Sequence, residues 1–286
     1  MTMPPPYPPV PAGSDAQGLA SLSASAGPPW ALVTGASRGI GAAVARELAT
    51  RGWALVLTAR SGEALEALAT ELRDAHGVPV EVVVADLAEA GAPARLEAFT
   101  EGSGRPVDLL VNNAGVGQAT LFVDEDPATM EATLAVNVLA TTALLHRFAS
   151  HMVRRGRGRI LNVVSVGAFQ PGPLVAVYYA SKAYLLSLSE AIGNELAPHG
   201  ITVTTLCPGP TRTDFHRRAG FRGSAAPPGV TLAEARDVAR AGVEGALAGK
   251  GVVVPGFANR LLVLATRFLP RRLLLRATRR VQERRL

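Results

Sequence analysis

The stretch TGASRGIGAAVARELATRG, residues 34–52, decides how the rest of the chain is interpreted. It follows the aliphatic run WALV and places Gly35, Gly39 and Gly41 where a strand turns sharply into an amphipathic helix. Glycines at such a turn let the backbone N–H groups of the helix N-terminus approach a pyrophosphate. A tight turn without a ligand would use the same glycines, but their place between strand and helix favours dinucleotide binding.

Beyond this stretch, short aliphatic runs alternate with alanine- and leucine-rich segments of helical spacing. The strand-like runs are residues 30–35, 54–59, 80–86, 107–115, 158–165, 201–209 and 251–255. About seven strands joined by helical crossovers predict an α/β fold with one parallel sheet covered on both faces. In this doubly wound, Rossmann-type architecture, ligands bind at the carboxyl ends of the strands.

The ends of the chain differ from this repeating pattern. We expect a disordered Pro/Ala/Ser-rich leader at 1–28, a catalytic domain at 29–258 and a basic helical tail at 259–286. The leader has the features of neither a secretory signal nor a transit peptide. No run approaches the ~20 apolar residues of a membrane-spanning helix.

Charge and cysteine content narrow the classes of function. The chain of 286 residues has a formal charge of +6, but nine arginines against Glu283 give the segment from Arg260 onward +8, which leaves −2 for the rest. Nucleic acid is therefore not an expected partner of the domain. The one cysteine, Cys207, lies in an apolar run and indicates a packing role in a reducing, cytoplasmic compartment.

Several motifs together identify a family. TGASRGIG, LLVNNAG, Asn137 in LAVNVLA, Ser165 in RILNVVS, YYASK and PGPTRT occur in the order found in short-chain dehydrogenases/reductases. The chain resembles this family from about residue 30 to residue 255, and its wording is most similar to the bacterial DltE-like group. The resemblance implies hydride transfer between a nicotinamide cofactor and a carbonyl or secondary alcohol.

The end of the second strand indicates which nicotinamide cofactor binds. An acid there would bind the ribose 2′-hydroxyl and repel a 2′-phosphate. LVLTARSG offers Ala59 and Arg60 instead, and Arg38 in the glycine turn adds a second guanidinium. Two arginines at one corner suit a phosphate dianion, so we predict NADP(H) rather than NAD. The alternative is two solvated surface arginines.

The family resemblance implies further cofactor contacts. Asp86 and Leu87 would hold the adenine, and Thr211 and Thr213 the carboxamide side of the nicotinamide. Outside the family motif, Asn112 and Asn113 would be interpreted as a turn pair. The other cofactor residues implied are Ser37, Ile40, Asn113, Ala114, Gly115, Tyr178, Lys182, Pro208 and Gly209.

Lys182 is one of two lysines in a chain with 27 arginines, which indicates a specific role. A phenol has a pKa of about 10, and a nearby ammonium lowers it. Helical spacing lets either Tyr178 or Tyr179 be its partner. The family's YxxxK pattern selects Tyr178, and Tyr179 is then expected to pack or to face another subunit. Lys250 looks like a loop residue.

The resemblance also implies the catalytic roles. Tyr178 would be the general acid and base, and Ser165 would bind and orient the substrate carbonyl. Lys182 would hold the nicotinamide ribose and lower the pKa of Tyr178. Asn137 would hold a water that connects Lys182 to solvent, although it could also be a polar residue that kinks a helix.

Other polar groups have no expected function. The histidines share no metal-ligand spacing, so no metal is predicted, and we interpret them as surface or packing residues: 76, 146, 151, 199 and 216. The basic run HMVRRGRGRI at 151–160 is interpreted as a solvated turn. In the tail, leucines and arginines interleave around Pro270. Docking on the protein, contact with an anionic membrane and disorder all remain open.

These observations predict an NADP(H)-dependent oxidoreductase. The apolar segment 211–230, a candidate lid, and the tail favour a lipophilic substrate, with steroid-like, acyl-thioester and xenobiotic ketones all open. The alternative is a non-catalytic NADPH-binding sensor or scaffold, against which Ser165, Tyr178 and Lys182 are all present. By resemblance we expect a homodimer or homotetramer, cytoplasmic or peripheral at the inner membrane surface.

Overall fold

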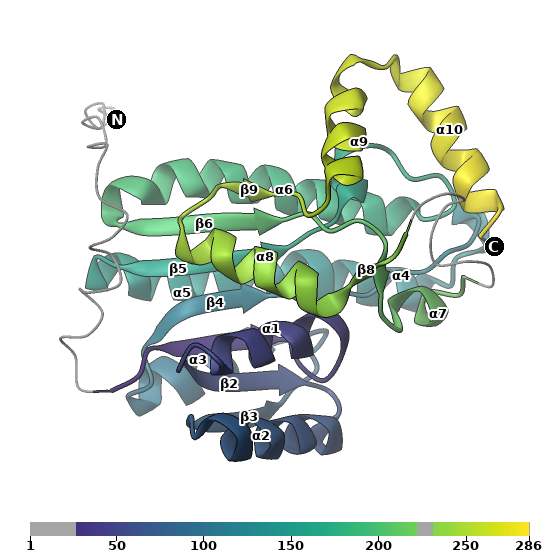
Figure 1. Cartoon of the computed structure of the whole chain (residues 1–286). Coiled ribbons are helices and arrows are strands. Elements are labelled where there is room, and N and C mark those ends of the chain that lie inside the picture. Colours follow the sequence, from purple (N-terminus) through teal and green to yellow (C-terminus); the bar gives the residue numbers. More distant parts are fainter. Residues whose placement is uncertain (1–26, 222–230, 286) are drawn as a thin grey trace, which may run out of the picture.

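The computed structural model describes residues 27–221 and 231–285, so nearly all of the predicted leader lies outside the described residues. Seven strands form one parallel sheet in the order β3-β2-β1-β4-β5-β6-β9 (Figure 1), which confirms the predicted fold. Their bounds are β1 Trp30–Thr34, β2 Ala54–Ala59, β3 Val80–Val84, β4 Val107–Asn112, β5 Gly158–Val163, β6 Ile201–Leu206 and β9 Val252–Val253.

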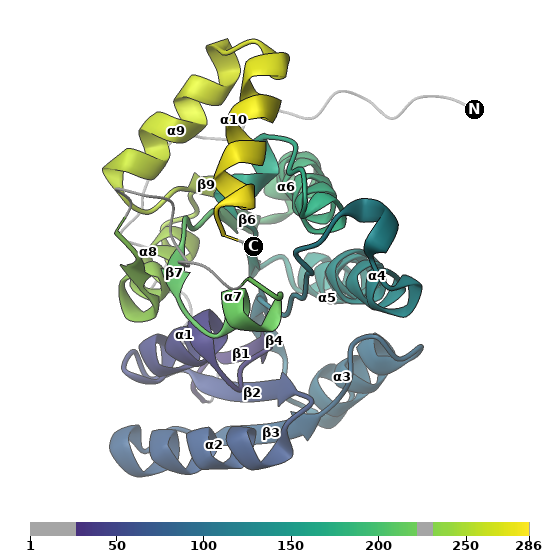
Figure 2. The same cartoon turned by 90° about the vertical axis from the view of Figure 1, so that its right-hand side faces the viewer.

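Helices cover both faces of the sheet (Figures 1 and 2). One core joins the sheet to α1 (Gly39–Ala49), α2 (Gly62–His76) and α8 (Ala235–Leu247). The other core joins it to α3 (Ala92–Thr100), α5 (Thr141–Arg155) and α6 (Ala176–Leu196). With both faces covered, the strands are mostly apolar, and every residue of β4 is buried, including the polar Asp108 and Asn112.

The chain order reverses between β1 and β4. The first three strands run outward from β1 to one edge, and β4 then returns to pair with β1 on its other side. The carboxyl ends of β1 and β4 are therefore neighbours, each followed by a loop that turns away from the sheet. In open α/β sheets this switch point is where ligands bind.

Most strands end before the predicted runs do. The runs ending at 86, 115, 165 and 209 continue for two or three residues beyond β3, β4, β5 and β6. Those extra residues leave the sheet and form loops at its carboxyl edge. Also beyond the sequence prediction is a small pair, β7 (Thr211–Arg212) with β8 (Ala233–Glu234). Shorter elements are η2 Glu101–Ser103, η3 Phe122–Asp124, η5 Val166–Phe169, η6 Ala197–His199 and α7 Phe215–Arg218.

One helical stretch has an unusual composition. Within the described residues, Pro127–Arg155 is long and apolar enough to cross a membrane by length and composition alone, with a mean hydropathy of 1.4. It consists of α4 (Pro127–Leu134), the π-helical η4 (Ala135–Ala140) and α5. Phe148 and Met152 are fully buried against the sheet, so this stretch packs as a core helix of the domain.

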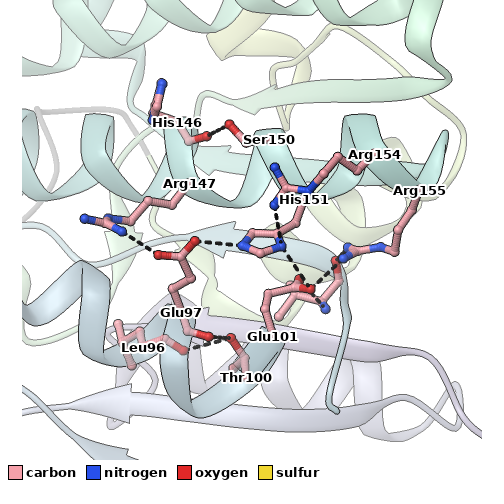
Figure 3. A network of polar contacts seen from close by, with 11 residues as sticks. Leu96, Glu97, Thr100, Glu101, His146, Arg147, Ser150, His151, Arg154 and Arg155 are labelled. Atoms are coloured by element: carbon pink, nitrogen blue, oxygen red, sulfur yellow. Dashed lines mark hydrogen bonds and ion pairs between the residues drawn. The ribbon is translucent and has the colours of Figure 1, made fainter. Parts of the chain in front are cut away.

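The charged end of α5 is bound to its neighbour α3 (Figure 3). His151 Nε2 lies 2.7 Å from Glu97 Oε1, and Arg155 donates to Glu101 at 2.6 Å. Arg147 also pairs with Glu97. The prediction of a solvated turn at 151–160 is therefore wrong for most of the run, because residues 151–155 belong to α5, residues 158–160 belong to β5, and His151 and Arg155 have partners within the protein.

The tail forms two helices, α9 (Phe257–Phe268) and α10 (Arg271–Glu283), separated at Pro270 as predicted. The expected boundary at 259 falls inside α9. Leu274, Thr278 and Gln282 of α10 are buried, which confirms the docking interpretation for this helix. None of the residues of α9 is buried.

Substitution of Phe148 by Ala tests the packing of α5. The side chain is fully buried, and its loss leaves a cavity between helix and sheet. We expect the free energy of unfolding to fall by ~3–5 kcal/mol in urea titrations. Phe122→Ala is the control, because Phe122 is 60% exposed, and its effect should stay within ~0.5 kcal/mol. Equal effects of the two substitutions would contradict this packing.

Candidate active site

A cavity of about 690 Å³ opens at the carboxyl edge of the sheet. Figure 2 views this edge, with α7 and the end of α10 beside it. Two predicted residues, Gly41 and Asn137, do not line the cavity. The predicted residues that do are Gly35, Ser37, Arg38, Gly39, Ile40, Arg60, Asp86, Leu87, Asn113, Ala114, Gly115, Ser165, Tyr178, Lys182, Pro208, Gly209, Thr211 and Thr213.

The glycine turn requires its glycines for steric reasons. Gly35 has φ +64°, and a Cβ there would lie 2.9 Å from Ala114 Cα. A Cβ on Gly41 would lie 2.4 Å from Gly35 O, so this glycine lets α1 pack against the turn behind the cavity. The N-cap position, Arg38, makes no side-chain capping bond. The first N–H groups of α1 are thus suited to bind an anion.

Thr34 and Asn113 fasten the glycine turn to the end of β4. The Thr34 hydroxyl accepts from the backbone N–H groups of Asn113 at 3.0 Å and Ala114 at 3.1 Å. The Asn113 amide donates to the carbonyls of Thr34 at 2.9 Å and Gly35 at 3.2 Å. Asn112 instead bonds to Asn162 inside the sheet at 2.9 Å. Asn113 therefore shapes the cavity floor, whereas Asn112 is structural.

Three arginines gather at one end of the cavity. Arg38 and Arg60 come from the glycine turn and the end of β2, and Arg218 from α7. Burial lowers the pKa of the Arg218 guanidinium, and the positive charges of Arg38 and Arg60 lower it further. Arg60 also lies 3.7 Å from Asp86. Mutually repelling guanidinium groups beside a cavity are stabilised by a bound dianion.

Tyr178 and Ser165 meet at the other end. The Ser165 hydroxyl interacts with the Tyr178 phenol, and the Tyr178 side chain is half-buried at the wall of the cavity. The Ser165 hydroxyl also accepts from the Gly167 N–H at 3.0 Å, which fixes its position at the end of β5. Gly117 leaves room for the phenol, since a Cβ there would lie 2.8 Å from Tyr178 Cδ2. The Phe215 ring lies 5.1 Å away between centroids.

Burial controls the titration of this end. It raises the pKa of the Tyr178 phenol, an effect to which Tyr179 adds and which the Ser165 hydrogen bond opposes. It lowers the pKa of Lys182 to about 8. The Lys182 ammonium donates to the Val163 carbonyl at 2.9 Å and lies 5.8 Å from the Tyr178 ring centre. The raised pKa of Tyr178 differs from the expected lowering by Lys182, because desolvation of the phenol is the largest influence and the Lys182 ammonium is not among the groups that shift it.

Asn137 lies one layer behind the cavity, in the π-helical η4. Its amide oxygen accepts from the Val116 N–H at 2.9 Å, and its amide nitrogen donates to Val116 O at 2.8 Å and to Ser181 Oγ at 3.0 Å. A Cβ on Gly115 would lie 3.3 Å from Lys182 Nζ and 3.5 Å from Asn137 Oδ1. Asn137 thus lies close to Lys182, with Gly115 between them, and it occupies an irregular turn of the helix. Its role in holding a water stays a prediction.

Tyr179 joins the active-site helix to the end of the chain. Its ring covers Gly172, where a Cβ would lie 2.2 Å from Tyr179 Cγ. Its hydroxyl accepts from Gln282 Nε2 of α10 at 2.8 Å. Packing within the chain is thus confirmed for Tyr179. Gln282 and Arg285 both line the cavity, and sequence reasoning gave neither a role in the site.

His216 is a second residue that sequence reasoning missed. It was expected at the surface or in packing, yet it lines the cavity on α7. Burial and, to a smaller extent, the charge of Arg285 lower the pKa of its imidazole to about 4, so the ring is neutral at neutral pH. Its Nδ1 is buried without a hydrogen-bond partner among the described residues. No group of metal-ligating side chains occurs in the described ranges.

Thr211 and Thr213 begin the segment after β6. The Thr211 hydroxyl donates to Gly209 O at 2.9 Å, and the Thr213 methyl would lie 3.2 Å from a Cβ on Gly39. Thr213 therefore faces the glycine turn. The predicted lid at 211–230 includes β7 and α7, and its residues 222–230 lie outside the described part.

Comparison with known proteins places the chain among dehydrogenases. The family model for short chain dehydrogenase matches residues 29–220. The very-long-chain 3-oxoacyl-CoA reductase of Phaeosphaeria nodorum is 34% identical over 178 residues, which are 61% of this chain. The chain spans about half of that relative's length, 52%.

Solved structures of similar proteins match a larger part of the chain than the sequence relative does. A short-chain dehydrogenase from Sphingobium yanoikuyae in complex with NADPH has a TM-score of 0.75 and 36% identity, covering 84% of this chain and 93% of that one. The bulky-bulky ketone specific alcohol dehydrogenase from Comamonas testosteroni has a TM-score of 0.72 and 31% identity, covering 85% and 93%.

The buried ammonium predicts a pH effect on stability. Between pH 8 and 10.5, Lys182 releases its proton in the folded protein and keeps it in the unfolded chain. The free energy of unfolding of the wild type, measured without added cofactor, should therefore rise with pH relative to Lys182→Met. The slope of this difference is at most ~1.4 kcal/mol per pH unit. Parallel pH profiles of the two proteins would contradict the burial of this ammonium.

Proposed function

The chain belongs to the short-chain dehydrogenase/reductase family, and from that premise we propose that it is an NADP(H)-dependent oxidoreductase that interconverts a carbonyl and a secondary alcohol. One observation carries the proposal. The half-buried phenol of Tyr178, which interacts with Ser165 and lies beside Lys182, is in the same cavity as an arginine cluster suited to a phosphate.

The cavity fits an extended dinucleotide. Arg38, Arg60 and Arg218 would hold the 2′-phosphate, and the N-terminus of α1 with Ser37 the pyrophosphate. Asp86 and Leu87 would flank the adenine. Lys182 would hold the ribose next to the nicotinamide, and Thr211 and Thr213 would contact its carboxamide side. When bound, NADPH supplies the hydride.

Ser165 and Tyr178 would act on the substrate oxygen. Ser165 donates a hydrogen bond that orients the carbonyl, and Tyr178 transfers its phenolic proton to the oxygen as negative charge develops there. The raised pKa keeps the proton on Tyr178 at neutral pH, which is the form that a general acid needs. Lys182, with its pKa near 8, can pass a proton onward through the Asn137 region. These features support reduction as the favoured direction.

The substrate end of the cavity supports a lipophilic ketone. Its walls near Tyr178 include Val116, Val175, Phe215 and Phe221. The similar proteins include one named for very-long-chain 3-oxoacyl-CoA and one for bulky ketones. Gln282, Arg285 and His216 add polar groups to the same wall. We propose a substrate with a bulky apolar body and a polar group remote from its carbonyl.

We also propose that the protein forms a homo-oligomer. Leu134, Leu139 and Tyr184 are large, 40–67% exposed, and lie on the helices that follow β4 and β5. They support a homodimer or homotetramer formed through these helices. The division at residues 29–258 and 259–286, a cytoplasmic location and membership of the DltE-like group also stay predictions.

Tyr178→Phe tests the general acid. Loss of the hydroxyl should lower kcat for ketone reduction at least ~10²-fold, while NADPH binding measured by fluorescence is retained. Tyr179→Phe is the matched control, because it removes only the hydrogen bond to Gln282 and should keep kcat within ~10-fold. Near-normal turnover by Tyr178→Phe would refute the assigned role.

Arg60→Ala tests the cofactor preference. Loss of one charge-assisted contact should raise KM for NADPH ~10–100-fold and leave KM for NADH unchanged. Arg217→Ala is the control, since Arg217 is 77% exposed and pairs with Asp214. An equal rise of KM for both cofactors would show that Arg60 does not recognise the 2′-phosphate.

A further inference from the structure

We propose that α9 presents a membrane-binding face, which inserts side chains into the interface of a bilayer of anionic phospholipid. The α9 outer face consists of Phe257, Leu261, Leu264 and Phe268. The sequence leaves docking and membrane contact of the tail as alternatives. In the structure the two helices differ, because α10 buries three of its residues, whereas α9 contacts the domain only through partly buried residues on one side.

The exposure of large apolar side chains is concentrated in this part of the molecule. Of the sixteen that are exposed in the described residues, eight lie between 257 and 275. Phe257 and Phe268 are 81% and 79% exposed, and Leu261 and Leu264 are 57% and 50% exposed. Such a patch on a protruding element indicates an interaction surface. In Figures 1 and 2 the two helices form a hairpin that projects from the domain.

The four side chains of the α9 outer face point in one direction. At 3.6 residues per turn they fall within an arc of about 60° around the helix axis. Arg260 and Arg267 lie beside this arc, on one flank of it. An apolar stripe flanked by arginines is the pattern of a helix that lies in the plane of a membrane interface.

The opposite side of α9 holds it in place. Asn259, Val263 and Thr266 are partly buried, and the Asn259 amide donates to Pro255 O at 2.7 Å. Asn259 also lies over Gly209, where a Cβ would be 2.3 Å from its Oδ1. The helix therefore has a defined rotation, with its apolar face directed away from the domain.

The outer side of α10 supplies further positive charge on the same hairpin. Leu274, Thr278 and Gln282 face inward, so the helical period directs the exposed Arg272, Arg276, Arg279 and Arg280 outward. Of these, Arg279 pairs with Glu283 at 2.7 Å, the one acid in the hairpin. The hairpin thus carries both exposed apolar side chains and a strong positive charge.

Two partners could cover the α9 outer face, a second copy of this chain or a lipid bilayer, and the positive charge of the hairpin favours the bilayer. In a dimer with two-fold symmetry, the same surface of both copies would bring arginines close to arginines. A bilayer that contains anionic phospholipid has the complementary charge and accepts the apolar side chains. If the proposed function holds, the hairpin also links the bilayer to the cavity, because Gln282 and Arg285 at its far end line that cavity.

Co-sedimentation of the full chain with vesicles tests the proposal. Wild-type protein should pellet with vesicles of phosphatidylcholine mixed with phosphatidylglycerol, and far less with phosphatidylcholine alone. The triple variant Leu261→Ser, Leu264→Ser, Phe268→Ser should lose at least ~10-fold in vesicle partitioning. The matched control Leu121→Ser, Phe122→Ser, Val123→Ser removes three apolar side chains that are 46–79% exposed elsewhere on the molecule, and it should partition as the wild type does.

Two further measurements test whether the triple variant is folded and whether the arginines of α10 contribute to vesicle binding. NADPH-dependent reduction of a water-soluble ketone should be the same in wild type and triple variant, which shows intact folding and separates this test from that of the proposed function. Arg272→Glu with Arg276→Glu should weaken binding to the anionic vesicles with α9 unchanged. Equal pelleting of wild type and triple variant would overturn the proposal. The proposal would also be overturned if the wild type did not bind vesicles and the triple variant had a smaller oligomeric mass than the wild type. A second copy of the chain would then cover the α9 outer face.

Discussion

The site depends on one junction, where the turn after β1 is fastened to the turn after β4. Thr34 satisfies two backbone N–H groups of the β4 loop with a single hydroxyl, and the Asn113 amide returns two hydrogen bonds to the carbonyls of the glycine turn. Because these strands pair in parallel, their loops leave the sheet side by side. The glycine turn is thereby held open at one end of α1, and the cavity follows from that geometry.

The chemistry follows from burial at the other end of the cavity. Removal of water raises the pKa of the Tyr178 phenol and lowers the pKa of the Lys182 ammonium, so both groups are moved toward their neutral forms. Under the proposed function, an acid that keeps its proton beside an ammonium that readily loses one could pass a proton along without a stable internal charge. Such a pair would suit donation to a substrate oxygen better than storage of a phenolate.

The strands and the motif residues could be predicted from the sequence, because strand patterns and short motif spacings involve residues that are close together in the chain. Sequence reasoning could not identify Arg218, His216, Gln282 or Arg285, which enter the cavity from α7 and from the end of the chain. Gln282 meets Tyr179 across 103 positions, and no periodicity reports such a contact. Helical spacing left Tyr178 and Tyr179 equivalent, and tertiary packing separates them: one meets Ser165 and the other meets α10. The strand ends were placed too late because the predicted runs took in the loop residues that follow each strand, such as Asp86, Asn113 and Ser165, which line the cavity.

Pro270 explains how one amphipathic segment can have two surfaces with different partners. Without an N–H at this position the helix is interrupted, and α10 begins with a new rotation relative to α9. The buried positions of α10 recur at 274, 278 and 282, whereas the large apolar residues of α9 at 257, 261, 264 and 268 remain exposed. In one continuous helix, the buried positions of α10 and the exposed apolar positions of α9 would lie along a single stripe that winds slowly around the helix. The interruption lets α10 complete the cavity wall while α9 keeps its apolar side free of the domain.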